Sequence, residues 1–285
     1  MGAYGLIGVL CVGAVLVPAL AVAAWRPDLP WDLARRAGLA RATAVLDAAA
    51  GAVAAAAGRV PAALVAYVFT VGAVMLVCWP LGVLARGSLA LDEAVFRWSA
   101  AHRTPALTDL MDVVTQMGNR SITKPATLLA VVVLFLLRRR RRWVVPAVFL
   151  TFFVTQFYFQ GILEHAVGRP DPPGAGGNYP SGGCARVILT YGLVVWFCLR
   201  ERRAVSRPAA VALYGLVVAA GVLEAYSRTY LLKHWVTDTV GGLVYGGVLL
   251  LGAVAVATLL DRPGPLAGHA PEGSRGRERP RAGVA

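Results

Sequence analysis

Long apolar stretches separated by short polar segments dominate the pattern of this chain. Most of them are uncharged over about 18 residues or more, which is enough for a helix to cross the hydrocarbon core of a bilayer. The pattern predicts seven such helices, and the third has the shortest uncharged run. Their predicted ranges are 4–24, 62–85, 126–137, 143–167, 184–199, 208–226 and 235–260.

The segments between these helices predict how the chain is organised. Residues 1–61 hold the first span and an Ala- and Arg-rich connector, and residues 62–262 hold a core of six spans. Within that core, residues 86–122 mix polar and apolar positions and predict short helices outside the bilayer, whereas residues 168–183 predict a Pro- and Gly-rich loop. The tail, 263–285, has the composition of a disordered segment. The predicted fold class is therefore all-α, a polytopic membrane protein.

The charge balance sharpens this prediction. Of 285 residues, 58% are hydrophobic and only 15% charged, yet the formal net charge is +13. In a soluble protein such an excess would suggest nucleic acid, but here the arginines lie in clusters between apolar runs, so no nucleic-acid partner is expected. Basic residues near the ends of membrane spans mark the cytoplasmic side. All four clusters fall on one side of seven spans, which predicts a multi-pass cell-membrane protein with a cytoplasmic C-terminus. They occupy 26–41, 138–142, 200–207 and 262–281.

Three polar segments gather at the opposite, extracytoplasmic ends of spans four to seven. Ionisable residues at the rim of a membrane bundle are costly to bury and usually functional. The segments come from separate parts of the chain but lie on the same side of the membrane, which predicts that they form one composite site. They are Gly168-Arg169-Pro170, Pro180-Ser181-Gly182-Gly183, and Ser227-Arg228 followed by His234 and Asp238.

These residue types suit a phosphate group. Arg169 and Arg228 carry planar, permanently charged forks that bind phosphate oxygens in pairs. Ser181-Gly182 precedes a predicted helix, where free backbone N–H groups and the helix dipole favour an anion. His234 and Asp238 are four residues apart, which on a helix places them on one face. Asp238 is then expected to orient the imidazole as a nucleophile.

Each piece also has a purely structural interpretation. An Arg-Pro pair at a helix end is often a snorkelling arginine and a stop signal, and Pro-Ser-Gly is an ordinary turn before a helix. His234 with Asp238 would serve as a structural pair, and Glu224 would hold Arg228 as an ion pair one helical turn away. The occurrence of all the pieces in order, on one predicted side, favours the phosphate site.

With these residues in view, the chain resembles the type 2 phosphatidic-acid phosphatase (lipid phosphate phosphatase) superfamily. The motifs of that family are Lys-x6-Arg-Pro, Pro-Ser-Gly-His and Ser-Arg-x5-His-x3-Asp, and the third is complete here from Ser227 to Asp238. The resemblance spans roughly residues 62–260 and covers the six-helix core of the family. It implies a lipid substrate, such as phosphatidic acid or a polyprenyl phosphate or diphosphate, with no metal or cofactor.

The resemblance also implies residue roles. His234 would attack phosphorus and form a phosphohistidine, with Asp238 orienting its ring. The phosphate would be held by Arg169, Arg228 and the backbone at Ser181-Gly182.

The chain departs from the family at two positions. Ile162 stands where the first motif has lysine, and Gly183 stands where the second has histidine, the general acid for the leaving group. Loss of a general acid costs typically ~10²–10⁴-fold when the leaving group needs a proton, and a phosphate leaving group needs one much less than an alkoxide does. Arg186, one turn beyond Gly183, is a candidate substitute for the lost charge, and His165, one turn before Arg169, for the lost acid.

Three functions remain open from these residues. The leading hypothesis is a metal-independent lipid phosphatase acting through phosphohistidine on the extracytoplasmic side. Ile162 and Gly183 motivate a second, a catalytically weak or inactive relative that binds or transports a phosphorylated lipid. The third is phosphoryl transfer to an acceptor other than water. The sequence leaves the lipid and the oligomeric state undetermined.

Overall fold

The chain is represented by a computed structural model that describes residue 52 and residues 58–138, 140–201 and 207–261. All the regular secondary structure in these residues is helical, and the predicted all-α class is confirmed. The helices are α4 (Arg59–Gly87), α5 (Leu89–Ala101), α6 (Pro105–Val114), η1 (Thr115–Gly118), α7 (Arg120–Leu137), α8 (Val144–Val167), α9 (Gly182–Arg186), η2 (Val187–Tyr191), α10 (Gly192–Glu201), α11 (Arg207–Tyr230) and α12 (Val236–Asp261).

Six helical stretches within the described residues are long and apolar enough to cross a membrane, and they correspond to the six predicted spans of the core. The predicted first span, 4–24, and the tail, 263–285, lie outside the described residues. The third predicted span is α7, and it begins at Arg120 rather than near 126. Asn119 accounts for the earlier start, because its side chain accepts a hydrogen bond from the backbone of Ser121 and caps the helix.

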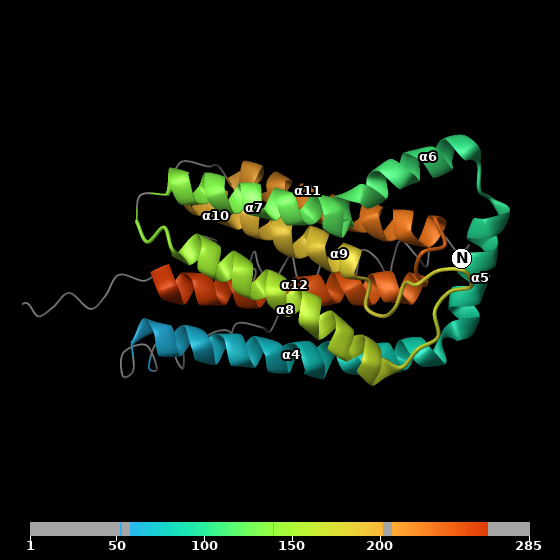
Figure 1. Cartoon of the computed structure of the whole chain (residues 1–285), viewed down its shortest axis with the longest axis horizontal. Helices are drawn as coiled ribbons and strands as arrows, with labels where there is room; N and C mark the ends of the chain where they lie inside the picture. Colours follow the sequence, from blue (N-terminus) through green and yellow to red (C-terminus); the bar gives the residue numbers. More distant parts are fainter. Residues whose placement is uncertain (1–51, 53–57, 139, 202–206, 262–285) are drawn as a thin grey trace, which may run out of the picture.

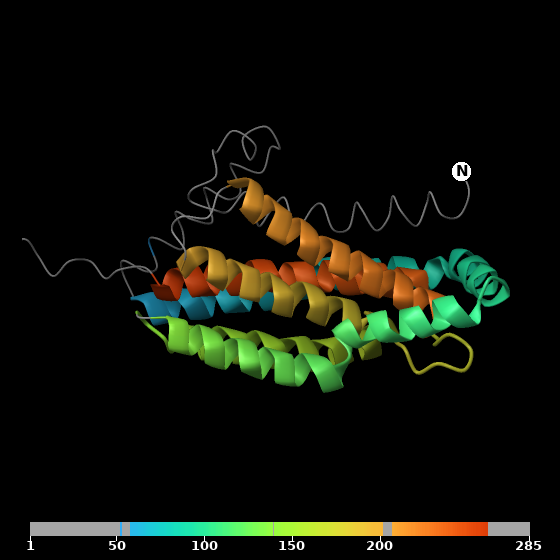
Figure 2. The same ribbon diagram turned by 90° about the horizontal axis from the view of Figure 1, so that it is seen from above.

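The spanning helices run along the long axis of an elongated bundle, and α5 and α6 lie at one end of it (Figure 1). We call this the α5 end; it also carries the loops after α8 and α11. The opposite end carries the α7–α8 turn and the last residue of α12, and we call it the arginine end. Viewed from above, α11 tilts away from α10 toward the arginine end (Figure 2). Among the described residues, the α7–α8 connection therefore lies at the opposite end from the connections after α4, α8 and α11, as the charge pattern predicted.

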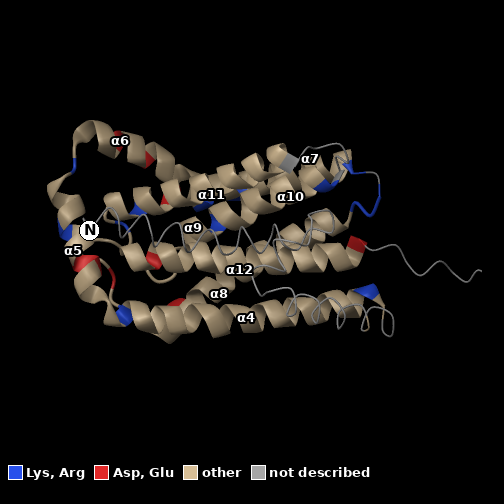
Figure 3. Cartoon of the chain, turned by 180° about the vertical axis from the view of Figure 1, so that it is seen from behind, with Lys and Arg blue, Asp and Glu red and all other residues tan. Residues whose placement is uncertain are grey.

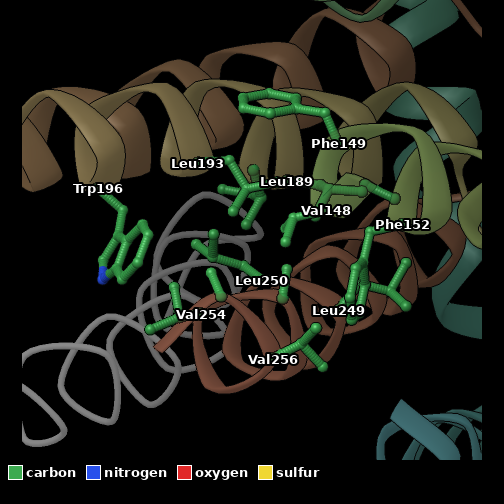
Figure 4. Packing of buried hydrophobic residues seen from close by; sticks show 14 of the residues in the cluster. Val148, Phe149, Phe152, Leu189, Leu193, Trp196, Leu249, Leu250, Val254 and Val256 are labelled. Carbon is green, nitrogen blue, oxygen red and sulfur yellow. The ribbon is translucent and has the colours of Figure 1, made fainter. Parts of the chain in front are cut away.

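Two spans form the centre of the bundle. Most residues of α12 and of the stretch from α9 to α10 are buried, whereas α4, α7, α8 and α11 expose much of their apolar surface. Apolar side chains from α8, α10 and α12 interdigitate in the main core, where Phe149, Leu193 and Leu249 are almost fully buried (Figure 4). The exposed apolar surface of the outer helices is what a lipid-facing shell requires.

A close contact between α9 and α12 sets the position of the fifth span. A Cβ atom added to Gly246 of α12 would lie 2.7 Å from the carbonyl oxygen of Ala185, which is too close for a side chain. Glycine at this position therefore lets the two helices pack backbone to backbone. Beyond α9 the helix widens into a π-helical turn, η2, before it continues as α10, and such turns are frequent at functional sites.

Ion pairs close the arginine end. The Arg138 side chain pairs with Asp261 at the end of α12, and Arg200 Nε lies 3.1 Å from the same carboxylate. Arg141 Nη1 donates to the carbonyl oxygen of Leu260 over 2.8 Å. Figure 3 shows this charged cluster at the end of the bundle opposite to α5. Part of the arginine run thus ties the ends of α7, α10 and α12 together.

Candidate phosphate site at the α5 end

The three polar segments predicted to form one site all lie at the α5 end of the bundle (Figure 1). The first follows α8, the second starts α9, and the third runs from the last turn of α11 to the first turn of α12. The third segment differs locally from the prediction, which ended the sixth span at 226. Ser227 and Arg228 are still helical, because α11 continues to Tyr230.

Arg169 occupies the centre of a buried network. Gly168 ends α8 in the left-handed conformation (φ +56°), which turns the chain so that the next side chain points back into the protein. The guanidinium Nη1 of Arg169 lies 2.6 Å from Asp238 Oδ1 and 2.5 Å from Thr237 Oγ1, and its Nη2 pairs with Asp92. Its Nε is buried and has no hydrogen-bond partner among the described residues. The arginine expected to meet phosphate freely is thus held by two carboxylates.

His234 and Asp238 are close in space but do not share a helix. Because α12 begins at Val236, His234 lies in the preceding turn and Asp238 in the first helical turn. Asp238 Oδ2 accepts the backbone N–H of Trp235 over 3.1 Å and lies 3.8 Å from His234 Nδ1. That nitrogen is buried and makes no hydrogen bond to any described residue. The shared helix face was therefore the wrong reason for their proximity, which a capping turn brings about instead.

The Ser181-Gly182 turn is joined to this network through the backbone. Ser181 N donates to the carbonyl oxygen of Asp238 over 2.9 Å, and α9 starts at the next residue. The Ser181 hydroxyl is fully buried and, within the described part of the chain, has no partner. Arg169, the imidazole of His234 and the start of α9 are thus all in contact with one residue, Asp238.

A second group of charges surrounds Gly183. Arg228 Nε bonds Glu224 Oε1 over 2.8 Å, so the ion pair expected one turn apart is present. Arg186 is buried and donates through Nε to the carbonyl oxygen of Gly118 over 2.9 Å, while its Nη1 has no partner in the described residues. A Cβ atom at residue 183 would lie 2.7 Å from both Arg228 Nη2 and Glu224 Oε1. The space that a histidine needs at this position is therefore taken by the Arg228–Glu224 pair.

The other departure from the family has a different outcome. Ile162, at the position of the family lysine, is 46% exposed on α8, so its apolar side chain lies on the outside of the bundle. His165, the candidate acid, lies on the surface beside Arg169, and both line an open cleft of about 520 Å³. The cleft is also lined by Glu164, Gly168, Pro170, Asp171 and Asn178.

Reasoning from sequence missed Asp92. This residue belongs to α5, which was predicted only as a short helix outside the bilayer, yet its side chain is fully buried against Arg169. Burial raises the pKa of the Asp92 carboxyl above its ordinary value, while hydrogen bonds from Thr237 and the charge of Arg169 lower it. The signal in the sequence was a carboxylate that ends a short apolar run at the start of this helix, Leu89-Ala90-Leu91-Asp92.

Comparisons with known proteins bear on the family and on the fold. Residues 148–261 match the model of the PAP2 superfamily, which confirms the resemblance drawn from the motifs. The chain is 26% identical over 164 residues to phosphatidylglycerophosphatase B of Bacillus subtilis (strain 168), covering 55% of this chain and 79% of the relative. Its fold is similar to the crystal structure of a transmembrane PAP2-type phosphatidylglycerolphosphate phosphatase from Bacillus subtilis. The TM-score is 0.57 at 23% identity, covering 64% of this chain and 92% of that one.

Proposed function

We propose that this chain, a PAP2-type membrane phosphatase related to phosphatidylglycerophosphatase, hydrolyses a lipid or polyprenyl phosphate or diphosphate through a phosphohistidine at His234. The observation that carries the proposal is the contact of Arg169 and His234 with the same buried carboxylate of Asp238. A guanidinium, an imidazole and a helix start at one point provide charge, nucleophile and backbone donors for one phosphoryl group.

The proposed reaction has two steps. His234 Nε2 attacks phosphorus, a P–N bond forms, and the bond from phosphorus to the leaving oxygen breaks. Asp238, 3.8 Å from Nδ1 in the resting site, accepts the Nδ1 proton in a hydrogen bond as the ring becomes positively charged. Water then attacks the phosphohistidine, releases phosphate and restores the imidazole. Arg169, Arg228 and Arg186 stabilise the phosphoryl oxygens, so that activity is expected to persist in EDTA.

The substrate class follows from the missing acid. With Gly183 in place of the family histidine, an alkoxide leaving group has no proton donor, whereas a phosphate leaving group has little need of one. Arg228 lies beside Gly183 and Arg186 follows one turn along the same helix, so both are available to stabilise a departing phosphate. A lipid diphosphate is therefore the proposed best substrate, although the relatives are named for a phosphomonoester. His165 is the remaining candidate acid for monoesters.

The proposed orientation places the site on the extracytoplasmic side. Among the described residues, the arginine end carries Arg138, Arg140, Arg141, Arg142 and Arg200, and basic residues beside membrane spans favour the cytoplasm. The α5 end would then face the outside, and the substrate would enter from the outer leaflet. Cysteine labelling of intact cells at exposed Glu93, with a membrane-impermeant reagent, tests this orientation.

One experiment tests the activity and the substrate together. Purified protein is incubated with phosphatidylglycerophosphate, phosphatidic acid, polyprenyl phosphate and polyprenyl diphosphate, and phosphate release is measured with and without EDTA. Faster release from the diphosphate, lost in His234→Ala, is the expected result. Equal rates on simple monoesters would refute the leaving-group argument, and release that survives the substitution would refute the mechanism.

The absent family residues favour a second candidate function, in which the same site binds or moves a phosphorylated lipid without turnover. Ile162 faces outward and Gly183 leaves no room for a histidine, so two functional groups of the family are missing. Lipid binding that depends on Arg228, with no phosphate released from any substrate, would support it. Transfer to another acceptor is separated from hydrolysis by trapping phosphohistidine and adding candidate acceptor alcohols.

A further inference from the structure

Asp92 lies in α5, outside the segment that matches the superfamily model, which starts at residue 148. It is almost completely buried and uses both carboxylate oxygens. Oδ1 accepts the backbone N–H of Thr237 over 3.0 Å, and Oδ2 accepts the Thr237 hydroxyl over 2.9 Å and pairs with Arg169 Nη2. Asp92 therefore contacts both the arginine and the first turn of the helix that carries Asp238.

Asp92 is not the only residue of α5 that packs against the site. Phe96, one turn further along the helix, packs against Trp235 with ring centroids 5.5 Å apart. Trp235 in turn donates its indole N–H to the carbonyl oxygen of Pro170 over 2.8 Å. Asp92 and Phe96 share one helix face, and that face contacts Arg169 and the residues that lead into α12. The position of α5 is therefore set against the site itself.

The two carboxylates bind different nitrogens of the Arg169 guanidinium, and this affects how Asp238 is oriented. Asp92 takes Nη2 and Asp238 takes Nη1, so each carboxylate binds the fork through one nitrogen. An arginine with a single carboxylate neighbour favours the two-pronged arrangement, in which both oxygens are engaged. Here the guanidinium bonds Asp238 Oδ1, whereas Asp238 Oδ2 accepts from Trp235 N and lies 3.8 Å from His234 Nδ1.

We infer that Asp92 is a positioning residue for the proposed phosphoryl transfer: by holding Arg169 Nη2, it fixes the guanidinium and keeps Asp238 Oδ2 available to orient His234. The inference rests on the proposed function, and it assigns a role to a helix outside the matched segment. Without Asp92, the guanidinium turns to engage both oxygens of Asp238, and the imidazole loses its orienting acceptor.

The primary test is Asp92→Asn, which keeps the size of the side chain and removes its charge. We expect kcat to fall by roughly 10- to 100-fold, the range typical of lost supporting contacts, while KM, set mainly by the lipid tail, changes less than threefold. Asp92→Glu is expected to restore part of the rate. The matched control is Glu93→Gln, an exposed carboxylate on the same helix, which should leave both constants unchanged. A fall in the folded fraction with full kcat per folded molecule would overturn the inference.

A double-mutant cycle with Arg169→Lys tests whether Asp92 acts through the guanidinium. Because lysine has no fork to divide, Asp92→Asn should lower kcat less than threefold in the Arg169→Lys background. Equal effects of Asp92→Asn in the two backgrounds would show independent action and overturn the inference.

The same cycle is run on the binding of inorganic phosphate, measured by calorimetry in detergent, which needs no turnover. Asp92→Asn should weaken phosphate binding several-fold when Arg169 is present and not in the Arg169→Lys background. A wild-type protein that releases phosphate from no lipid but keeps this coupling refutes the proposed activity and leaves the positioning role standing. Additive binding effects refute the positioning role alone.

Discussion

Two buried arginine centres at the α5 end differ in their balance of charge. In the first, Arg169 is shared by the carboxylates of Asp92 and Asp238. In the second, the described residues place one carboxylate, that of Glu224, beside Arg186 and Arg228, and it pairs with Arg228. Uncompensated charge is expensive to bury in a membrane protein. The excess of carboxylate fixes geometry around His234, whereas the excess of guanidinium is suited to an anionic substrate.

The largest expected effect distinguishes the acidic members of the two centres. Asp238→Asn removes the orienting acceptor of His234 and the Arg169 ion pair, so kcat should fall by roughly 10³–10⁴-fold, as for the orienting aspartate of a catalytic triad. Glu224→Gln leaves an acceptor for Arg228 and should cost about tenfold or less. Initial rates of phosphate release on purified variants measure both. Comparable losses in the two variants would contradict the division of roles.

The cationic members provide the next test. Arg186→Gln removes charge beside Gly183, so it should lower diphosphate hydrolysis by roughly 10²-fold, the cost of losing a donor to developing charge, and monoester hydrolysis much less. Arg169→Gln, in the other centre, should lower both about equally. Rates on polyprenyl diphosphate and polyprenyl phosphate are compared for each variant. An equal effect of Arg186→Gln on the two substrates would argue against a role with the leaving group.

A smaller effect is expected when the family histidine is restored. Gly183→His brings a side chain into the space held by Arg228 and Glu224, and overpacking of this kind costs about 1–3 kcal/mol. We expect a lower melting temperature and a rate reduced by about tenfold, rather than a gain of monoester activity. Gly183→Ala serves as the control for the backbone. A variant that is stable and faster on monoesters would show that Arg228 and Glu224 move to accommodate the histidine.

The smallest expected effect is on stability. Burial raises the pKa of Asp92 in the folded protein, so the folded state favours the protonated carboxyl. The protonated Asp92 carboxyl contributes fully to the free energy of unfolding below the ordinary carboxyl pKa of about 4. This contribution is lost as the pH rises through the raised pKa of Asp92 in the folded protein. Asp92→Asn, which stays neutral, should therefore gain melting temperature relative to wild type as the pH increases from 4 to 7, by a few degrees. A growing deficit over that range would mean that the charged carboxylate is the stabilising form.

A neutral or positive effect on stability would also agree with the inferred role of Asp92. A residue that lowers stability while it supports activity is typical of functional sites, where geometry is kept at the expense of folding free energy. Melting curves for Asp92→Asn and Glu93→Gln in the same detergent separate this effect from a general change in surface charge.

The hydropathy pattern by itself determined the six helical spans of the described core, because a helix that crosses a bilayer must be apolar over a length that the membrane sets. The alternation of the arginine clusters supported even α7, whose apolar run is short. Motif spacing identified the segments around Arg169, Ser181 and His234, since these residues are close along the chain or carry recognisable chemistry.

Only the tertiary structure decided what these side chains contact. Asp92 is separated from Arg169 by 77 positions, and no periodicity relates the two. The proximity of His234 to Asp238 comes from a capping turn, and the clash at Gly183 arises where α9 meets α11. Ion pairing depends on distance in space, whereas a sequence records distance along the chain, so the charge balance of the two arginine centres could be read only from the folded protein.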